Sequence, residues 1–185
     1  MATLNATNLK HASSGSNNIV LAADGSTTIS NLSDAGKLLQ VVNTQTGAMS
    51  TSTTTIPNDD TIPQITEGFE VMTRTITPTN ASNILLINVV CHLSSSANGL
   101  PTTALFLGTT TDAIACTFSH TFGSANYPKV HNFTHKMTAG STSELTFRVR
   151  TGNNNSGTVT FNGRSAASTR GGTLASSITI MEIAA

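Results

Sequence analysis

Residues 84–93 constrain the fold of this chain more than any other stretch. They form its longest apolar run, and β-branched residues, the central Asn88 and turn-forming residues on both sides favour a strand over a helix. One side of such a strand would carry Ile84, Leu86 and Val90, and the other Leu85, Ile87, Val89, Cys91 and Leu93. Because both sides are apolar, the run predicts the central strand of a β-sandwich, buried on both faces.

The composition favours a β-protein whose partners are not attracted by charge. Ser, Thr and Asn make up roughly two-fifths of the chain, which suits exposed strand faces and turns better than helices. Charged residues account for only 10%, with nine basic and nine acidic side chains in 185 residues. A net charge of zero provides no long-range field for nucleic acid or an anionic membrane, so we expect neither as a partner.

The sequence indicates neither a membrane span nor a secretion signal nor a disulfide. No apolar run approaches the roughly 18 residues of a membrane span, and the first ten residues do not resemble a secretion signal, so we expect no membrane insertion and synthesis in a host cytoplasm. Cys91 and Cys116 both fall in predicted strands, which favours free buried thiols over a disulfide.

Residues 1–35 are predicted to be an extended N-terminal segment. Two short apolar pieces, at 19–21 and 27–29, flank the turn formers Asp24 and Gly25 and indicate a hairpin. An isolated hairpin is only marginally stable in water. The segment is therefore either an anchor that becomes ordered against a partner or a flexible leader.

Residues 36–185 are predicted to form one all-β head, an antiparallel sandwich or jelly roll, because short strands follow one another at near-regular spacing. The stretch 43–61 lacks an apolar period and is predicted to be a long loop, as is 164–172. We expect strands at 36–42, 65–76, 84–93, 104–107, 113–118, 129–137, 143–151, 158–161 and 177–183.

Two patterns resemble metal or catalytic sites without meeting their requirements. His131 and His135 have a spacing that binds zinc on a helix, but on a strand they lie about 13 Å apart at roughly 3.3 Å per residue, which excludes a shared metal. The adjacent carboxylates Asp59 and Asp60 would point apart in a loop. We therefore predict no metal site, no cofactor and no cofactor-binding residue.

No enzyme motif is present either. Ser119 and His120 are neighbours in sequence, which is not the geometry of a nucleophile and its base, and no Gly-x-Ser-x-Gly elbow occurs. We expect no catalytic residue and no enzymatic activity.

Four motifs in order carry a resemblance over nearly the whole chain: NIVLAADG at 18–25, GKLLQVV at 36–42, ITPTNASNILL at 76–86 and SITIMEI at 177–183. Together they resemble the small fibre or spike proteins of tailed bacteriophages. The resemblance implies an N-terminal segment that attaches to the virion and a jelly-roll head, similar to the C1q/TNF fold, assembled as a homotrimer. Asn83 departs from the pattern, which more often has lysine there, and we expect no change of fold because the position lies at a turn.

The expected function is that of a structural protein on the surface of a virion. One interpretation is a tail or head fibre that contacts the host, with a cell-surface receptor as a candidate partner; the alternative is a capsid decoration protein that stabilises the shell. The chain has no Trp and a single Tyr, Tyr127, which disfavours a carbohydrate site built on aromatic faces.

Overall fold

The computed structural model describes residues 7–9, 12–13, 15, 19–25, 27–29, 36–123 and 125–185. The chain divides into two compact units, Met1–Ala35 and Gly36–Ala185. Parts of the first unit, including Asn18 of the leader motif, lie outside the described residues. None of the described residues belongs to a helix long and apolar enough to cross a membrane.

The first unit contains a small antiparallel sheet in the order β1-β2-β3. The expected hairpin is present: β2 pairs with β3, Ile19 lies opposite Ile29, and Gly25 adopts a positive φ of 84° in the connecting turn. A third strand, β1, pairs with β2 on its other edge. The three strands are β1 (Asn8–Leu9), β2 (Ile19–Leu21) and β3 (Thr27–Ile29).

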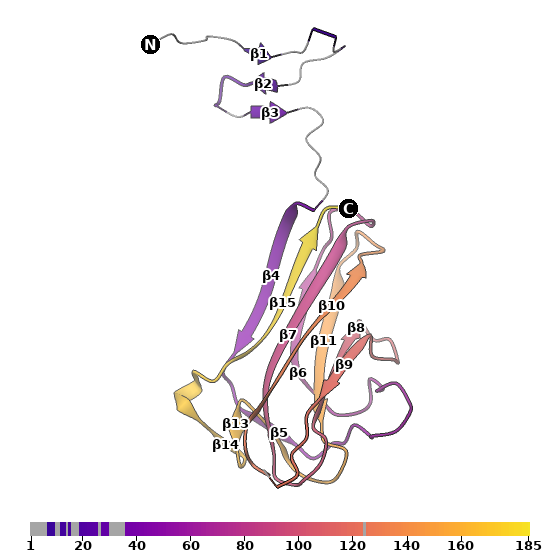
Figure 1. Ribbon diagram of the computed structural model, residues 1–185, viewed down its shortest axis with the longest axis vertical. Coiled ribbons are helices and arrows are strands. Elements are labelled where there is room, and N and C mark those ends of the chain that lie inside the picture. Colours follow the sequence, from indigo (N-terminus) through magenta and orange to yellow (C-terminus); the bar gives the residue numbers. More distant parts are fainter. Residues whose placement is uncertain are drawn as a thin grey trace. The chain divides into compact units, whose positions relative to one another are not determined.

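The second unit is an all-β sandwich of two antiparallel sheets, as the sequence predicted (Figure 1). The first sheet has the order β4-β15-β7, with β10 on the other edge of β7, and continues from β7 through β12 to β5. The second sheet has the order β6-β11-β8-β9. The strands of the first sheet are β4 (Leu38–Thr46), β5 (Ser50–Ser52), β7 (Ile84–Ser95), β10 (Lys129–Thr138), β12 (Val159–Phe161) and β15 (Ser176–Ile183). Those of the second are β6 (Phe69–Ile76), β8 (Thr102–Leu107), β9 (Ala115–Phe118) and β11 (Leu145–Gly152).

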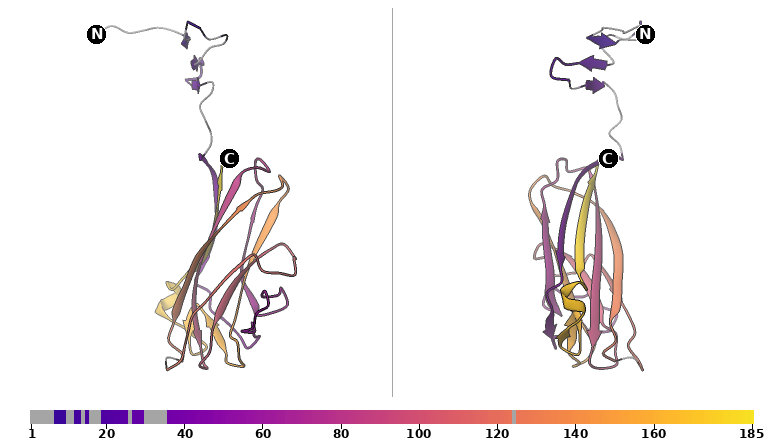
Figure 2. Two further views of the ribbon diagram at one scale, coloured as in Figure 1. Left: turned by 45° about the vertical axis from the view of Figure 1, so that its right-hand side comes forward. Right: turned by 90° about the vertical axis from the view of Figure 1, so that its left-hand side faces the viewer.

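The central strand occupies the predicted place. Ile84 to Val90 of β7 pair with the terminal strand β15 on one edge, and Ile84 to Leu93 pair with β10 on the other. The inward side chains of β7 are completely buried against those of the second sheet, among them Phe147 and Val149 of β11. Figure 2 shows the strands of the head from two further directions.

The prediction that β7 is buried on both faces is wrong for the single chain. Leu85, Ile87 and Val89 are fully buried, whereas Ile84, Leu86 and Val90 on the other side are only partly covered. Within the described part of the second unit, these outward side chains keep solvent exposure that the inward ones lose to the second sheet. Cys116 also departs from expectation, because β9 is an edge strand and this thiol points to solvent, while Cys91 is free and buried as predicted.

Both predicted loops contain more structure than expected. β4 continues to Thr46 because its Asn, Thr and Gln residues pair with β15 from Ser176 to Thr179, and β5 follows within the stretch predicted as loop. The later loop contains the hairpin β13 (Gly163–Arg164) and β14 (Ala167–Ser168) and the 3-10 turn η1 (Arg170–Gly172). Backbone pairing formed these elements without an apolar period that sequence reasoning could detect.

A buried carboxylate joins three elements at the end of the sandwich where the chain enters at Gly36. The oxygens of Glu182 on β15 accept hydrogen bonds from Gln40 on β4 and from Thr79 and Asn83 in the turn before β7, at 2.5–2.8 Å. Burial by itself would raise the pKa of Glu182, but the hydrogen bonds from Asn83, Gln40 and Thr79 outweigh it and lower this pKa to about 2. Asn83 is therefore a buried structural residue and not only a turn position.

Candidate functional site

Six apolar side chains gather at one end of the outward face of the first sheet. The strand registers place Val41, Met181 and Leu86 directly opposite one another on β4, β15 and β7, and Ile183 opposite Ile84 beside them. Val41 is 51% exposed and Leu39 36% exposed. We call this set the apolar patch: Leu39, Val41, Ile84, Leu86, Met181 and Ile183.

A polar belt crosses the same face next to the apolar patch. Asn43 donates to the Thr179 hydroxyl at 2.8 Å, and Asn88 donates to Asn132 and Thr134 at 3.1 Å. These amides satisfy one another within the chain, which leaves the belt nearly uncharged. Lys136 on β10, opposite Leu86, is the only ionised side chain among the outward residues of β4, β15, β7 and β10. Such a face suits contact with an uncharged or self-complementary surface.

His131 occupies a buried hydrogen-bonded site between the two sheets. Its Nε2 lies 2.8 Å from the Ser119 hydroxyl and its Nδ1 lies 2.7 Å from the Thr103 hydroxyl. Burial lowers the pKa of His131 to about 4, and burial raises the pKa of the nearby Cys91 thiol to about 12, although a hydrogen bond with Thr103 opposes that rise.

This geometry does not make Ser119 a nucleophile. A general base needs a pKa near the working pH, and the neutral hydroxyl of Thr103 cannot stabilise an imidazolium as the carboxylate of a catalytic triad does. The cluster instead satisfies a core histidine and links β8 to β10. Sequence reasoning considered Ser119 only with its neighbour His120, whereas His120 stacks on Phe122 with ring centroids 4.2 Å apart.

His131 and His135 both lie on the strand β10, as the sequence predicted for the stretch 129–137. Within the described residues, no group of three His, Cys, Asp or Glu side chains is arranged to hold a metal ion.

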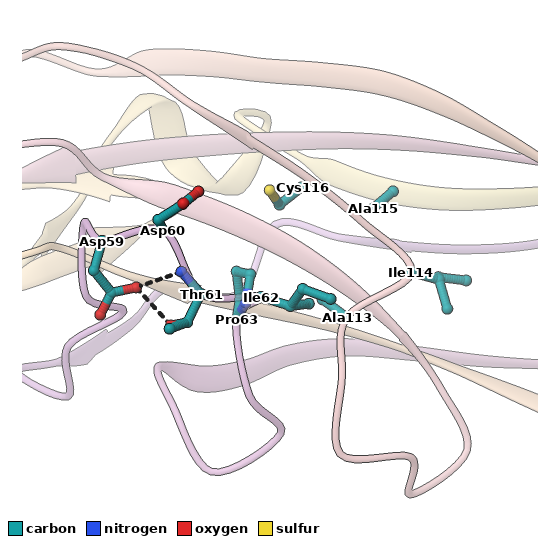
Figure 3. A pocket seen from close by; sticks show the side chains of 9 residues that line it. All are labelled: Asp59, Asp60, Thr61, Ile62, Pro63, Ala113, Ile114, Ala115 and Cys116. Atoms are coloured by element: carbon teal, nitrogen blue, oxygen red, sulfur yellow. Dashed lines mark hydrogen bonds between the residues drawn. The ribbon is translucent and has the colours of Figure 1, made fainter.

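Asp59 and Asp60 border an open hollow of about 330 Å³ formed with residues 113–116 (Figure 3). The Asp59 carboxylate accepts hydrogen bonds from the side chain and then the backbone N–H of Thr61, which lower its pKa. Figure 3 shows that Asp60 points away from Asp59, as the sequence predicted. Ile62, Pro63 and Ala113 make the remaining wall apolar, so the hollow lacks the convergent polar groups of a binding site.

Comparison with known families decides where this sandwich belongs. Residues 41–185 match the family described as the Pgp3 C-terminal domain. The chain belongs to this family. The match covers the head from β4 to the C-terminus, and a C1q/TNF-like β fold is the architecture that the Pgp3-type head adopts.

Solved structures with related folds are distant from this Pgp3-type chain. Eiger TNF from S. frugiperda shares 10% identity with a TM-score of 0.44, and the alignment covers 78% of this chain and 93% of Eiger. The VP2 subviral particle of infectious bursal disease virus shares 12% identity with a TM-score of 0.37, covering 82% of this chain and 38% of VP2. Latent PorU from Porphyromonas gingivalis shares 11% identity with a TM-score of 0.39, covering 80% of this chain and 13% of PorU. No curated protein sequence matches the chain.

The apolar patch is the feature that sequence reasoning missed. The strands predicted at 36–42 and 177–183 contain Leu39, Val41 and Met181, but the sequence does not indicate which side of a sheet these residues face. The alternation of apolar and polar residues in β4 indicates that one of its sides is apolar. It indicates a patch shared by several strands only once β15 is known to lie between β4 and β7.

Proposed function

We propose that this chain is a non-enzymatic structural protein of a tailed-phage virion, a short trimeric fibre or spike that presents its β-sandwich head to the host surface. The supporting observation is the apolar patch. Val41 and Leu86 lie on either side of Met181 on the same face of the sheet, and both side chains remain at least partly exposed among the described residues. Two further copies of the chain would remove this surface from water.

The choice of a second copy as the occupant rests on the character of the face. The polar belt pairs its own amides and each face carries a single formal charge, Lys136, so identical faces can approach with little like-charge repulsion. Trimeric assembly is also what the resemblance to phage fibres with C1q/TNF-like heads implies.

The unit Met1–Ala35 is the proposed attachment segment to capsid or tail proteins. Its described strands are only two or three residues long, which is too little sheet for independent stability. A partner on the virion would supply the missing contacts. The proposed location is the virion surface after synthesis in the host cytoplasm, without membrane insertion or nucleic-acid binding.

Capsid decoration is the second candidate. The chain has no Trp and a single Tyr, which disfavours a carbohydrate-binding tip built on aromatic faces and so favours this candidate. Electron microscopy of assembled particles distinguishes the two, because a fibre at the tail or a vertex and a protein spread over the shell give different positions and copy numbers.

Light scattering tests the assembly, and truncation tests the anchor. The full chain should have three times the 19.1 kDa protomer mass, and a stable folded monomer at micromolar concentration would contradict the trimer.

Deletion of residues 1–35 should preserve folding and the trimer but abolish incorporation into virions. Full occupancy by truncated heads would overturn the anchor, and loss of the trimer would mean that the segment belongs to the fold of the head.

A further inference from the structure

A cavity of about 420 Å³ lies beside the β13–β14 hairpin and η1, on the head. Figure 1 places these elements at the end of the sandwich opposite Ala185, and the N–H of Gly36 bonds to Ala184 at that other end. The cavity therefore lies far from the point where the chain enters the head. Its lining residues are Pro128, Arg164, Thr169, Arg170 and Leu174.

Two arginines supply unpaired positive charge to this cavity. Arg164 and Arg170 are exposed, and neither guanidinium has an ion pair or hydrogen bond with any described residue. The guanidinium carbon of Arg164 lies 4.7 Å from the ring centroid of Tyr127, which holds it in place by a cation–π contact. None of the lining residues is acidic. Ten N–H donors are thus available to an anion, five from each guanidinium, as counted for the residue type.

Thr169 adds a second, independent sign of a missing partner. Its Oγ1 is buried and has no hydrogen-bond partner among the described residues. Buried hydroxyls are nearly always bonded, because leaving one unpaired destabilises the fold. Because this oxygen has almost no surface exposed to the cavity, a ligand hydroxyl or carboxylate would become its partner once the Thr169 side chain rotates toward the cavity.

The backbone around the cavity is held in an unfavourable conformation. All five described non-glycine residues with clearly positive φ lie in the two segments beside it: Asn126, Asn162, Ser165, Ala166 and Arg170, at 51–66°. Ser165 and Ala166 form the two-residue turn of the β13–β14 hairpin, where Asn-Gly would be the relaxed choice.

Surrounding contacts keep this hairpin in place. Asn162 donates to the Thr46 carbonyl at 2.7 Å and accepts from Ser176 at 2.6 Å, and the N–H of Ala166 donates to Thr160. Strain that the surrounding structure over-determines concentrates at ligand sites, where it orients binding groups in advance.

The geometry points to a binding site for an anionic saccharide, a sugar ring that carries a carboxylate or phosphate. The two guanidiniums would hold the acidic group by paired N–H donors, Thr169 Oγ1 would bond a ring hydroxyl, and Pro128 and Leu174 would contact the apolar face of the ring. This inference deepens the proposed function, on which it rests, by naming the chemistry of the host surface that the head would contact.

A sugar acid fits better than other anions. Nucleic acid requires an extended basic surface, and the chain has zero net charge with only two arginines at this cavity. Free phosphate would leave most of a 420 Å³ cavity and its apolar wall unused. A sugar ring also compensates for the shortage of aromatic residues, because charge-assisted hydrogen bonds replace stacking as the source of affinity.

Calorimetry and ligand-observed NMR on the full chain test the site with four probes: glucuronate, glucose 6-phosphate, glucose and inorganic phosphate. We expect the two acidic sugars to bind with Kd about 1 mM, and glucose and inorganic phosphate to bind at least about tenfold more weakly. Raising the salt concentration should weaken the binding of the acidic sugars, because salt screens the charges. Equal binding of inorganic phosphate and glucose 6-phosphate would overturn the saccharide assignment, and so would binding of none of the probes.

Three variants separate binding from folding. R164Q and R170Q should each raise the Kd of the acidic sugars by about tenfold. The melting temperature should stay unchanged, because both side chains are exposed. T169V should weaken them by several-fold while maintaining or raising the melting temperature, since it removes an unpaired buried hydroxyl. R148Q removes a guanidinium on the other sheet and is the matched control, expected to bind as the natural chain does. Equal loss in R148Q and R170Q would show nonspecific charge effects and contradict the site.

The outcome is distinguishable from failure of the proposed function. A head that assembles as a trimer on virions but binds no acidic sugar disproves only this cavity's role. A head that binds the sugars but is absent from virions disproves the fibre assignment and leaves the site intact.

Discussion

The two outward faces of the sandwich differ in a way that separates folding from assembly. On the second sheet, Arg148 of β11 forms an ion pair with Glu70 of β6 at 3.0 Å, and Thr73 bonds the same carboxylate. That face is suited to water. On the first sheet, the corresponding positions near Gly36 form the apolar patch, with Val41 51% exposed. The difference teaches that one sheet presents a paired polar surface to solvent, while the other leaves apolar side chains partly exposed, which the proposed trimer would cover.

The largest effect on stability should come from a substitution on the inward side of the first sheet, because the core there holds the two sheets together. Ile87 is fully buried between the sheets, and I87D would place an unpaired carboxylate there at a cost of several kcal/mol, against a total stability of roughly 5–15 kcal/mol. We expect no folded protein by circular dichroism. I87V, which should cost about 1 kcal/mol, is the matched control. A cooperative melt of I87D near the temperature of the natural chain would refute the assigned register.

Glu182 should make the stability of the head depend on pH. It lies between Met181 and Ile183 of the apolar patch but points inward, and its folded pKa of about 2 is below the ordinary value of 4.5. The stabilisation is therefore fully present above about pH 5 and is lost as the pH falls toward 2, amounting to about 3 kcal/mol. Urea unfolding at pH 7, 5 and 3 measures it.

The variant E182Q isolates this residue. It should flatten the pH dependence between pH 5 and 3 and lower stability at pH 7, because an amide cannot accept all the hydrogen bonds that Asn83, Gln40 and Thr79 donate. The same slope in E182Q and the natural chain would assign the acid sensitivity to another group.

Leu86 tests the apolar patch directly. Although the sequence indicated a core position, its side chain points outward and is only half-buried in the chain. L86D should therefore fold, with a loss of about 1 kcal/mol or less, but should be monomeric because three carboxylates would meet in the proposed trimer. Light scattering measures the oligomeric mass of L86D, and a thermal melt of the same sample measures its stability. An L86D trimer would show that assembly uses another surface.

The smallest effect is expected on the face suited to water. R148S removes an exposed ion pair and should change the free energy of unfolding by less than about 0.5 kcal/mol, with the oligomeric mass unchanged. If R148S and L86D altered the mass alike, the distinction between the two outward faces would fail.

Local sequence signals located most of the strands. The strand predicted at 143–151 is β11, and the apolar run predicted β7, because these strands lie against the core and their apolar residues follow the pleat. The hairpin around Gly25 was predicted from turn chemistry. By contrast, the end of β4, strand β5 and the β13–β14 hairpin have polar sequences, and only pairing with distant strands forms them.

The sequence by itself determined the fold class, because period-two alternation and turn residues are local properties. Tertiary structure alone decided which apolar residues are core and which are surface: Leu86 and Ile87 look alike in sequence, and only the packing of the second sheet on one side distinguishes them. The same holds for the cavity, since Tyr127, Arg164 and Thr169 come together through non-local pairing of strands. Contacts between residues distant in sequence leave no periodic signal along the chain, and for that reason sites of this kind are found only in the folded molecule.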